Sequence, residues 1–228
     1  MPHDQAVIIR KFAVKDRTAV RQISCSTALM GDPSSAFFDD DEIFADALTL
    51  YFTDYEPESC FVGECDGRVV GYLIGAKDVK RMNKVTGQKI ILYLLMKALR
   101  RGTLLSGRNW RFFFHVFLSA VKGELTAPSF SKDYPAALHI NVMKGYRTDG
   151  VGSRLIDAYL NYLKAAGIAG VHFSTMSEGG SQFFKKKGFQ LLFDGRRSYF
   201  KYFLGKDVLL HIYGMRLPLG CVPTAGVN

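Results

Sequence analysis

Residues 147–153 carry the clearest chemical signal in the sequence, because Arg147, Gly150 and Gly152 fall between an apolar strand and a helix. Apolar residues alternate over 138–142, as in a buried strand, and recur at helical spacing after Gly152. Glycine accepts positive φ and lets a ligand approach the backbone closely. The N–H groups of a first helical turn favour an anion. The segment therefore predicts a cradle for a pyrophosphate.

Two other phosphate-binding loops do not fit this segment. A Walker A loop ends in Gly-Lys-Ser or Gly-Lys-Thr, whereas this loop reads Gly152-Ser153-Arg154. A dinucleotide fingerprint needs Gly-x-Gly-x-x-Gly and an acidic residue after the next strand, and the sequence has neither. The loop is therefore of another phosphate-binding type.

The order of strand, Arg-x-x-Gly-x-Gly and helix resembles the acetyl-CoA loop of the GNAT superfamily of N-acyltransferases. The segment from Ser177 to Phe189 is similar to that family's second motif, Asn-x-x-Ala-x-x-Phe-Tyr-x-x-x-Gly-Phe, in its spacing and its aromatic anchors. The opening strand Ile8-Ile9-Arg10 and the helix after Asp16 also match. The resemblance covers nearly the whole chain apart from residues 80–132. It implies one α/β domain over residues 1–228, with a mixed central sheet flanked by helices and a helical insertion between the third and fourth strands.

Two shorter runs, residues 134–141 and 165–172, resemble the bacterial acetyltransferases related to the acetyltransferase-like domain of O-GlcNAcase. That subgroup includes members whose catalytic competence is uncertain. The resemblance therefore supports two functions. The first is an acetyl-CoA-dependent N-acetyltransferase acting on a small-molecule or peptide amine, and the second is a non-catalytic acyl-CoA-binding module.

In this family a neutral amine attacks the thioester directly, so no metal or protein nucleophile is needed. Acetyl-CoA serves as the acyl donor. Ser177 replaces the usual asparagine of the second motif and Phe184 replaces the usual tyrosine, so the sulfur-side acid is missing. The cofactor contacts implied by the resemblance are Val142, Met143, Arg147, Thr148, Asp149, Gly150, Val151, Gly152, Ser153, Ser177 and Phe184.

Three residues are candidates for proton transfer in such a reaction. His172 lies five residues before Ser177, at a position that carries a catalytic histidine in some GNAT enzymes. An imidazole with its ordinary pKa of about 6.5 could accept the amine proton. His139 lies on the preceding strand and Tyr134 near that strand's entrance. Each candidate also has a structural interpretation, as a hydrogen-bonded buried histidine or a packed ring.

The remaining elements follow from local patterns. We expect helices from Asp16 to about Leu29 and over 42–51, and a hairpin over 61–75 around an Asp-Gly turn. In the family's fold the two helices form one wall of the acceptor cleft, and their acidic residues favour a cationic acceptor. Residues 190–193, 198–203 and 208–217 are predicted strands, with turns at 194–195 and 205–206.

The insertion contains two dense apolar runs, 90–99 and 110–121, which we predict to be helices. Three roles stay open for them. A lid over the acceptor site or a homodimer contact is favoured, an added core layer comes next, and docking at a membrane surface is favoured least.

Charge is distributed in blocks along this chain of 228 residues with net charge +9. Residues 31–66 hold eleven acids and no Lys or Arg, and residues 77–123 hold eleven Lys or Arg and one acid, a net charge of 11 − 1 = +10. Such blocks either face one another or serve partners, unless they are simply two solvated faces with some mutual attraction. No nucleic-acid-binding module accompanies them. With no apolar run of ~20 residues, no signal peptide and no metal spacing among four cysteines, we expect a cytoplasmic protein with reduced thiols.

Overall fold

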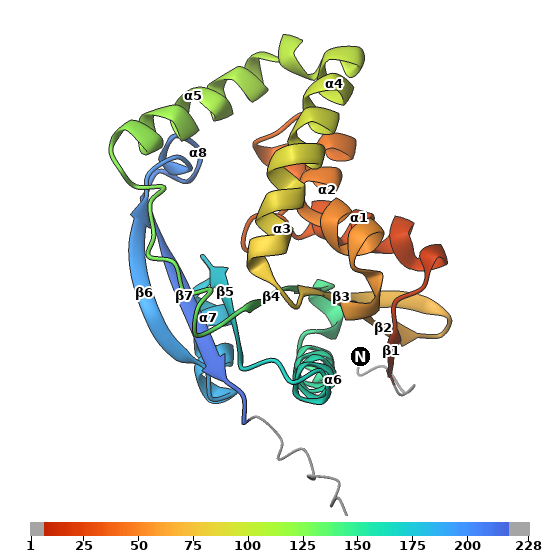
Figure 1. Ribbon diagram of the computed structural model, residues 1–228. Helices are drawn as coiled ribbons and strands as arrows, with labels where there is room; N and C mark the ends of the chain where they lie inside the picture. The colour runs from red at the N-terminus through yellow and green to blue at the C-terminus, as the bar shows by residue number, and fades with distance from the viewer. Residues whose placement is uncertain (1–6, 219–228) are drawn as a thin grey trace, which may run out of the picture.

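The computed structural model describes residues 7–218 and is built around a sheet of seven strands in the order β1-β2-β3-β4-β5-β7-β6 (Figure 1). The strands are β1 (Ile8–Lys11), β2 (Phe61–Cys65), β3 (Arg68–Ala76), β4 (Ala136–Val142), β5 (Gly170–Thr175), β6 (Gln190–Arg197) and β7 (Val208–Arg216). All neighbouring strands are antiparallel except β4 and β5, which are parallel. This mixed sheet confirms the fold class expected from the sequence.

Helices cover both faces of the sheet. They are α1 (Arg17–Ser26), α2 (Asp41–Leu50), α3 (Val79–Val85), α4 (Ile91–Arg101), α5 (Gly107–Val121), α6 (Val151–Ala165), α7 (Glu178–Lys186) and α8 (Lys201–Leu204). On one face α6 and α7 bury Leu155, Tyr159 and Phe184 against the strands. On the other face α1 packs Val20 and Ile23 on β2 and β3. The sheet therefore has a separate apolar core on each face.

The parallel strands β4 and β5 form the shortest pairing in the sheet. β4 and β5 pair only at Ala136–Val171 and Ala137–His172, whereas β4 pairs with β3 as far as Val142. Beyond Ala137 the two strands diverge, so the sheet opens in its middle. The opening lies directly before the turn that leads into α6.

The insertion forms two helical arms, as predicted, although the first arm begins earlier than expected. α3, a π-helical turn over 86–90 and α4 follow without a break, and α5 then runs across to α8 (Figure 1). Asp78 caps the start by accepting hydrogen bonds from the N–H groups of Lys80 and Arg81. The sequence prediction missed this start because residues 79–89 are mostly polar.

The insertion is pinned to the rest of the fold by aromatic rings. The ring of Phe112 on α5 lies with its centroid 5.4 Å from that of Phe37 and 6.0 Å from that of Phe200. Phe37 belongs to the loop between α1 and α2, and Phe200 to the connection between β6 and β7. α5 therefore ties together two loops that lie far apart in the sequence.

The prediction for residues 190–203 was wrong in two places. β6 runs through the expected turn at Asp194 and Gly195 and pairs with β7 as far as Arg197. Residues 198–203 are not a strand: residues 198–200 form a turn and residues 201–203 belong to α8, whose C-cap is Gly205 with φ +71°. Long-range burial explains the difference, because Phe200 is 7% exposed and packs on Phe37.

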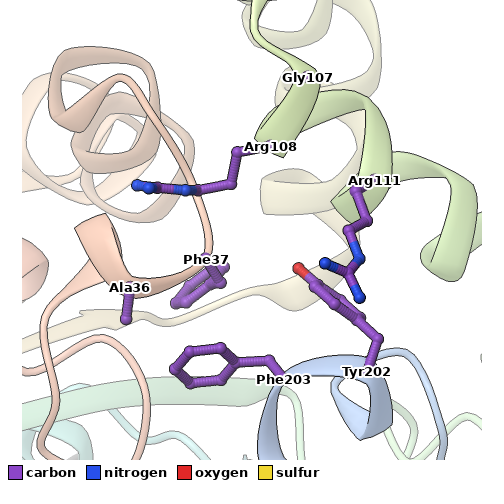
Figure 2. Close-up of a pocket in the computed structure, with 7 residues that line it drawn as sticks. All are labelled: Ala36, Phe37, Gly107, Arg108, Arg111, Tyr202 and Phe203. Atoms are coloured by element: carbon purple, nitrogen blue, oxygen red, sulfur yellow. The ribbon is translucent and has the colours of Figure 1, made fainter.

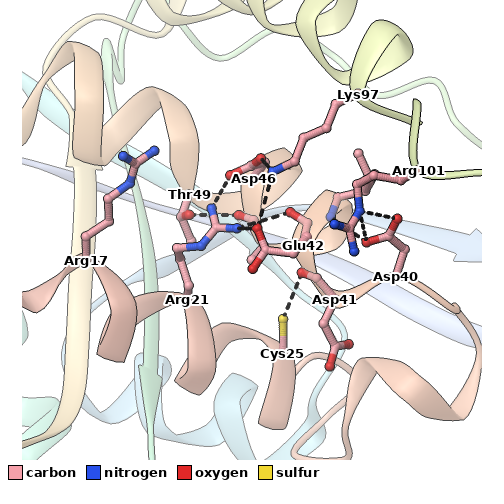
Figure 3. Close-up of polar contacts among 12 residues, drawn as sticks. Arg17, Arg21, Cys25, Asp40, Asp41, Glu42, Asp46, Thr49, Lys97 and Arg101 are labelled. Atoms are coloured by element: carbon pink, nitrogen blue, oxygen red, sulfur yellow. Dashed lines mark hydrogen bonds and ion pairs between the residues drawn. The ribbon is translucent and has the colours of Figure 1, made fainter. Parts of the chain in front are cut away.

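The acidic and basic blocks face one another across α2 and α4 (Figure 3). Asp46 is 2% exposed and accepts hydrogen bonds from Arg21 and from Lys97, whose Nζ lies 2.5 Å away. Asp40 pairs with Arg101 at 2.9 Å. Burial alone would raise the pKa of Asp46, but the hydrogen bonds from Lys97 and Arg21 outweigh it and hold that pKa below its ordinary value. The first of the expectations for the charge blocks is thus confirmed.

Candidate active site

The opening between β4 and β5 exposes backbone groups on one edge of β4. The Met143 N–H donates to the Val70 carbonyl at 2.9 Å, so the N–H and C=O of Val142 point the other way, toward β5. The Met143 carbonyl accepts the Tyr146 N–H at 2.9 Å. Both backbone groups of Met143 are therefore already bonded. Val142 is the residue whose backbone faces the opening.

The turn after β4 leads into the start of α6 and forms the predicted cradle. Gly150 occupies the N-cap position with φ +71°, a conformation that favours glycine. The first intrahelical bond runs from the Arg154 N–H to the Gly150 carbonyl at 3.1 Å. The N–H groups of Val151, Gly152 and Ser153 precede that bond and point out of the helix end. This arrangement suits an anion.

Gly152 leaves the mouth of the cradle open. A Cβ atom at this position would meet the ring of Phe183 at 3.5 Å and the side chain of Val142 at 3.9 Å. The space above Gly152 therefore lies between the end of β4 and the first turns of α7. A larger side chain at residue 152 would occupy that space.

Arg147 links the cradle to the loop between α1 and α2. Its Nε donates to the Val142 carbonyl at 3.1 Å. Its guanidinium lies against Gly31, where a Cβ would come within 3.0 Å of it. Gly31 has φ +110°, so glycine is required there for both conformation and space. Thr148 and Asp149 complete the turn, with the Thr148 hydroxyl 3.2 Å from the Asp149 carboxylate.

The two departures from the family motif on α7 have clear structural roles. The Ser177 hydroxyl accepts the Gly180 N–H at 3.2 Å and so caps α7. Phe184 is 5% exposed, and its ring lies 4.1 Å from that of Phe173 between centroids. Phe184 therefore belongs to the core and has no acidic proton to donate. A buried phenol of β7, Tyr213, hydrogen-bonds with the hydroxyl of Ser181, one turn earlier on α7.

His172 lies at the last position where β5 pairs with β4, beyond which these two strands separate. Its Nδ1 lies 2.7 Å from the Tyr134 carbonyl. A carbonyl can only accept, so Nδ1 carries the proton and Nε2 keeps its lone pair in the neutral ring. Burial lowers the pKa of His172, against hydrogen bonds to the carbonyls of Tyr134 and Ala136 that would raise it. At neutral pH His172 is thus an oriented, unprotonated base.

His139 belongs to a neutral network on the same face of the sheet. His172 pairs with Ala137, and side chains two residues apart share a face, so His139 lies on the His172 side. The Asn141 amide lies 3.3 Å from His139 Nε2 and donates to the Tyr72 hydroxyl at 3.0 Å. Burial lowers the pKa of His139 to about 4, which makes it a weaker base than a histidine of ordinary pKa.

Tyr134 is placed for packing. Cβ atoms built at Gly170 and Gly214 would lie 3.1 Å and 2.9 Å from its ring, so these two glycines make room for it. Its carbonyl orients His172. Within residues 7–218 its hydroxyl has no hydrogen-bond partner.

A pocket of about 370 Å³ opens between the α1–α2 loop, α5 and α8 (Figure 2). Arg108 lines it and pairs with Asp39 at 2.6 Å. The Arg111 guanidinium lies 4.9 Å from the centroid of the Tyr202 ring. The Tyr202 hydroxyl is buried and has no hydrogen-bond partner in the described chain. No group of three or more His, Cys, Asp and Glu within residues 7–218 could hold a metal ion.

Comparison with known proteins decides the family. The model of the acetyltransferase (GNAT) family matches residues 26–189, which include the cradle and the motif on α7. The chain belongs to the GNAT family.

Relatives of this GNAT chain share its fold at low sequence identity. It is 38% identical over 72 residues to the uncharacterised N-acetyltransferase MJ1530 of Methanocaldococcus jannaschii, a match that spans 32% of this chain and 38% of that protein. The crystal structure of SsHAT superposes with a TM-score of 0.68 at 24% identity, over 92% of this chain and 98% of that one. The structure of yncA from Salmonella typhimurium with its cofactor acetyl-CoA superposes with a TM-score of 0.57 at 13% identity, over 97% and 99%.

Several features of this GNAT chain were beyond sequence reasoning. The Arg108–Arg111–Tyr202 pocket and the Asn141–Tyr72 network join residues that are far apart in the sequence. No local sequence pattern predicts this pocket or this network. One signal was available for Asn141, because it lies two residues after His139 and must share its face.

Proposed function

We propose that this GNAT protein is an acetyl-CoA-dependent N-acetyltransferase that transfers the acetyl group directly to a small-molecule or peptide amine. One observation carries the proposal: the β4–β5 opening runs straight into the glycine cradle at the start of α6. An extended thioester arm fits such an opening, and a pyrophosphate fits the helix end behind it. The superposition on the structure of yncA with acetyl-CoA supports the proposal that this fold binds acetyl-CoA.

The proposed binding mode assigns the backbone the main part. The pyrophosphate would accept hydrogen bonds from the N–H groups of residues 151–153, with Arg147 adding positive charge. The pantetheine arm would bond the Val142 N–H, because the Val142 carbonyl already accepts a hydrogen bond from Arg147 Nε at 3.1 Å. Met143 would contribute only its side chain, which is 41% exposed, because both of its backbone groups are bonded. The Ser177 hydroxyl is used as a helix cap, so it would hold the arm weakly.

In the proposed reaction the amine nitrogen forms a bond to the carbonyl carbon, the C–S bond breaks and the thiolate leaves. The amine proton passes to Nε2 of His172, either directly or through water. His172 suits this task because its other nitrogen is fixed by the Tyr134 carbonyl and its lowered pKa keeps it unprotonated at neutral pH. Phe184 offers no proton, so solvent would protonate the thiolate.

The structure weakens the case for a cationic acceptor. That expectation rested on the acids of α2 and the loop before it, yet Asp39, Asp40 and Asp46 all pair with cations of the insertion. The acceptor wall is therefore largely neutralised. Two proteins of similar structure are named as a polyamine N-acetyltransferase of Drosophila melanogaster that forms N-acetylagmatine and an agmatine N-acetyltransferase. The amine panel therefore includes agmatine and polyamines, together with neutral and anionic amines and a peptide N-terminus.

The alternative is a non-catalytic acyl-CoA-binding module. Phe184 favours it, since the position of the usual acid is filled by a core ring. The similarity of residues 134–141 and 165–172 to the acetyltransferase-like domain of O-GlcNAcase stays part of this proposal.

Release of the free CoA thiol, measured over the amine panel, separates the two functions. An N-acetyltransferase gives release that depends on both protein and amine. His172→Gln should lower that release about 100-fold and leave CoA affinity unchanged in calorimetry. CoA binding without amine-dependent release from any amine would favour the binding module. Absence of both CoA binding and thiol release would contradict both proposed functions.

A further inference from the structure

The outward side of α4 is apolar although no part of the described chain covers it. Leu92, Leu95, Met96 and Leu99 recur at the spacing of one helix face and are 61%, 53%, 46% and 61% exposed. The opposite side of α4 is the one that packs, where Lys97 reaches Asp46. The apolar face of α4 therefore does not pack against the rest of the described chain.

α5 repeats this arrangement. Trp110, Phe114, Phe117 and Val121 lie on one face and are 60%, 56%, 63% and 69% exposed. Its inner side carries Phe112, which packs on Phe37 and Phe200, together with the buried Asn109 and Ser119. Leu105 in the turn between the two helices is 88% exposed. We call these nine side chains the outer face of α4 and α5, two helices that diverge from their connecting turn (Figure 1). Exposed apolar surface of this extent marks an interaction site.

Cations border the outer face. Lys84 and Lys89 precede it on the same continuous helix, Arg100 directly follows Leu99, and all three are exposed, although the Nζ of Lys89 also lies 5.8 Å from the centroid of the Tyr55 ring. Within residues 7–218 none of the three forms a salt bridge, because the acids nearby pair with the inner cations of the insertion. The outer face thus joins apolar and aromatic side chains with uncompensated positive charge.

We propose that the outer face docks on an anionic lipid bilayer, with α4 and α5 lying in the plane of the interface. Aromatic and leucine side chains enter the acyl boundary, and the bordering cations contact anionic headgroups. No helix of residues 7–218 is long and apolar enough to span a bilayer, so the proposal is for surface attachment. The proposal is independent of whether the protein transfers acetyl groups.

Charge also argues against a second copy of this chain as the occupant. A two-fold contact through the outer face would place the cations of one copy against those of the other. The sequence favoured a lid or a homodimer contact and ranked a membrane last. Our proposal places the membrane first, because the inner face already packs on the rest of the fold and the outer face is apolar and cationic.

Trp110 is the only tryptophan of the chain and lies on the outer face, so its fluorescence reports on this face alone. The protein is titrated with phosphatidylcholine vesicles and with vesicles containing 30% phosphatidylglycerol. We expect a blue shift with the anionic vesicles only, and quenching when their acyl chains are brominated. Unchanged emission with the anionic vesicles would overturn the proposal.

Matched variants separate this docking from general adhesion. Leu95→Ser/Phe117→Ser should lower the partition coefficient at least tenfold, whereas the control Leu209→Ser, on a residue 54% exposed on β7, should not change it. Lys84→Gln/Lys89→Gln/Arg100→Gln should lower it about 100-fold, since each cation near the surface adds about 1 kcal/mol, or about a factor of five. Circular dichroism confirms folding of each variant. Equal partition of all variants would contradict the proposal. So would a dimer mass by light scattering accompanied by a lipid-independent blue shift, because it would assign the face to a second copy.

Discussion

Gly152 offers the sharpest test of the cofactor cradle. Its missing side chain keeps open the space between Val142 and Phe183, and a Cβ there would make ordinary contacts of 3.5 and 3.9 Å. Gly152→Val should therefore still fold, while its branched side chain fills the mouth in front of the helix N–H groups. Two hydrogen bonds from backbone N–H to a charged phosphate would be lost, each worth about 1.5–3 kcal/mol.

The expected loss of about 3–6 kcal/mol corresponds to a rise of at least 100-fold in the Kd for CoA. Isothermal titration calorimetry measures the Kd, and circular dichroism with thermal unfolding confirms that the variant is folded. Gly87→Val is the matched control, because a Cβ at Gly87 meets nothing within 4 Å and the residue lies in the insertion. A folded Gly152→Val protein that binds CoA as tightly as the Gly87→Val control would refute the cradle.

Three further predictions concern catalysis and stability. The kcat for amine acetylation should rise with pH through an inflection below 6.5, the ordinary pKa of histidine, and then level, because burial lowers the pKa of His172; a kcat profile with no inflection below 6.5 would exclude His172 as the base. Asp46→Ala should lower the free energy of unfolding in urea by about 3–5 kcal/mol, since it leaves two partly buried cations without their carboxylate. Because the folded-state pKa of Asp46 is depressed, the free energy of unfolding of the wild type should fall as the pH drops below about 4, and the variant should lack the contribution of Asp46 to that fall. Gly75→Ala should destabilise the fold by at least about 3 kcal/mol, since its Cβ would overlap the buried ring of Tyr159, and a loss below 1 kcal/mol would contradict that packing.

The sequence was most informative where a local pattern specifies a local structure. The alternation over 138–142 and the glycines at 150 and 152 predicted a strand, a turn and a helix end, and all three are present. The apolar runs of the insertion predicted helices for the same reason. The start of that insertion at Val79 was missed, because its first turns lack an apolar period.

Features that depend on long-range contacts were not accessible from the sequence. The tautomer of His172 is set by the Tyr134 carbonyl, 38 residues earlier in the chain. Residues 198–203 looked like a strand by composition, yet with Phe200 buried against Phe37 they form a turn and the start of α8. Periodicity also could not say which side of α5 is covered, because both sides carry aromatic residues.

Acetyl transfer itself is the central claim, and mass spectrometry with isotope-labelled acetyl-CoA tests it most directly. The protein is incubated with labelled acetyl-CoA, first alone and then with an amine that supports thiol release. Direct transfer predicts that the protein mass stays unchanged in the first incubation, and that the label appears on the amine in the second, in amounts equal to the CoA released. A labelled protein that later passes its acetyl group to the amine, or CoA released without labelled amine, would contradict the account.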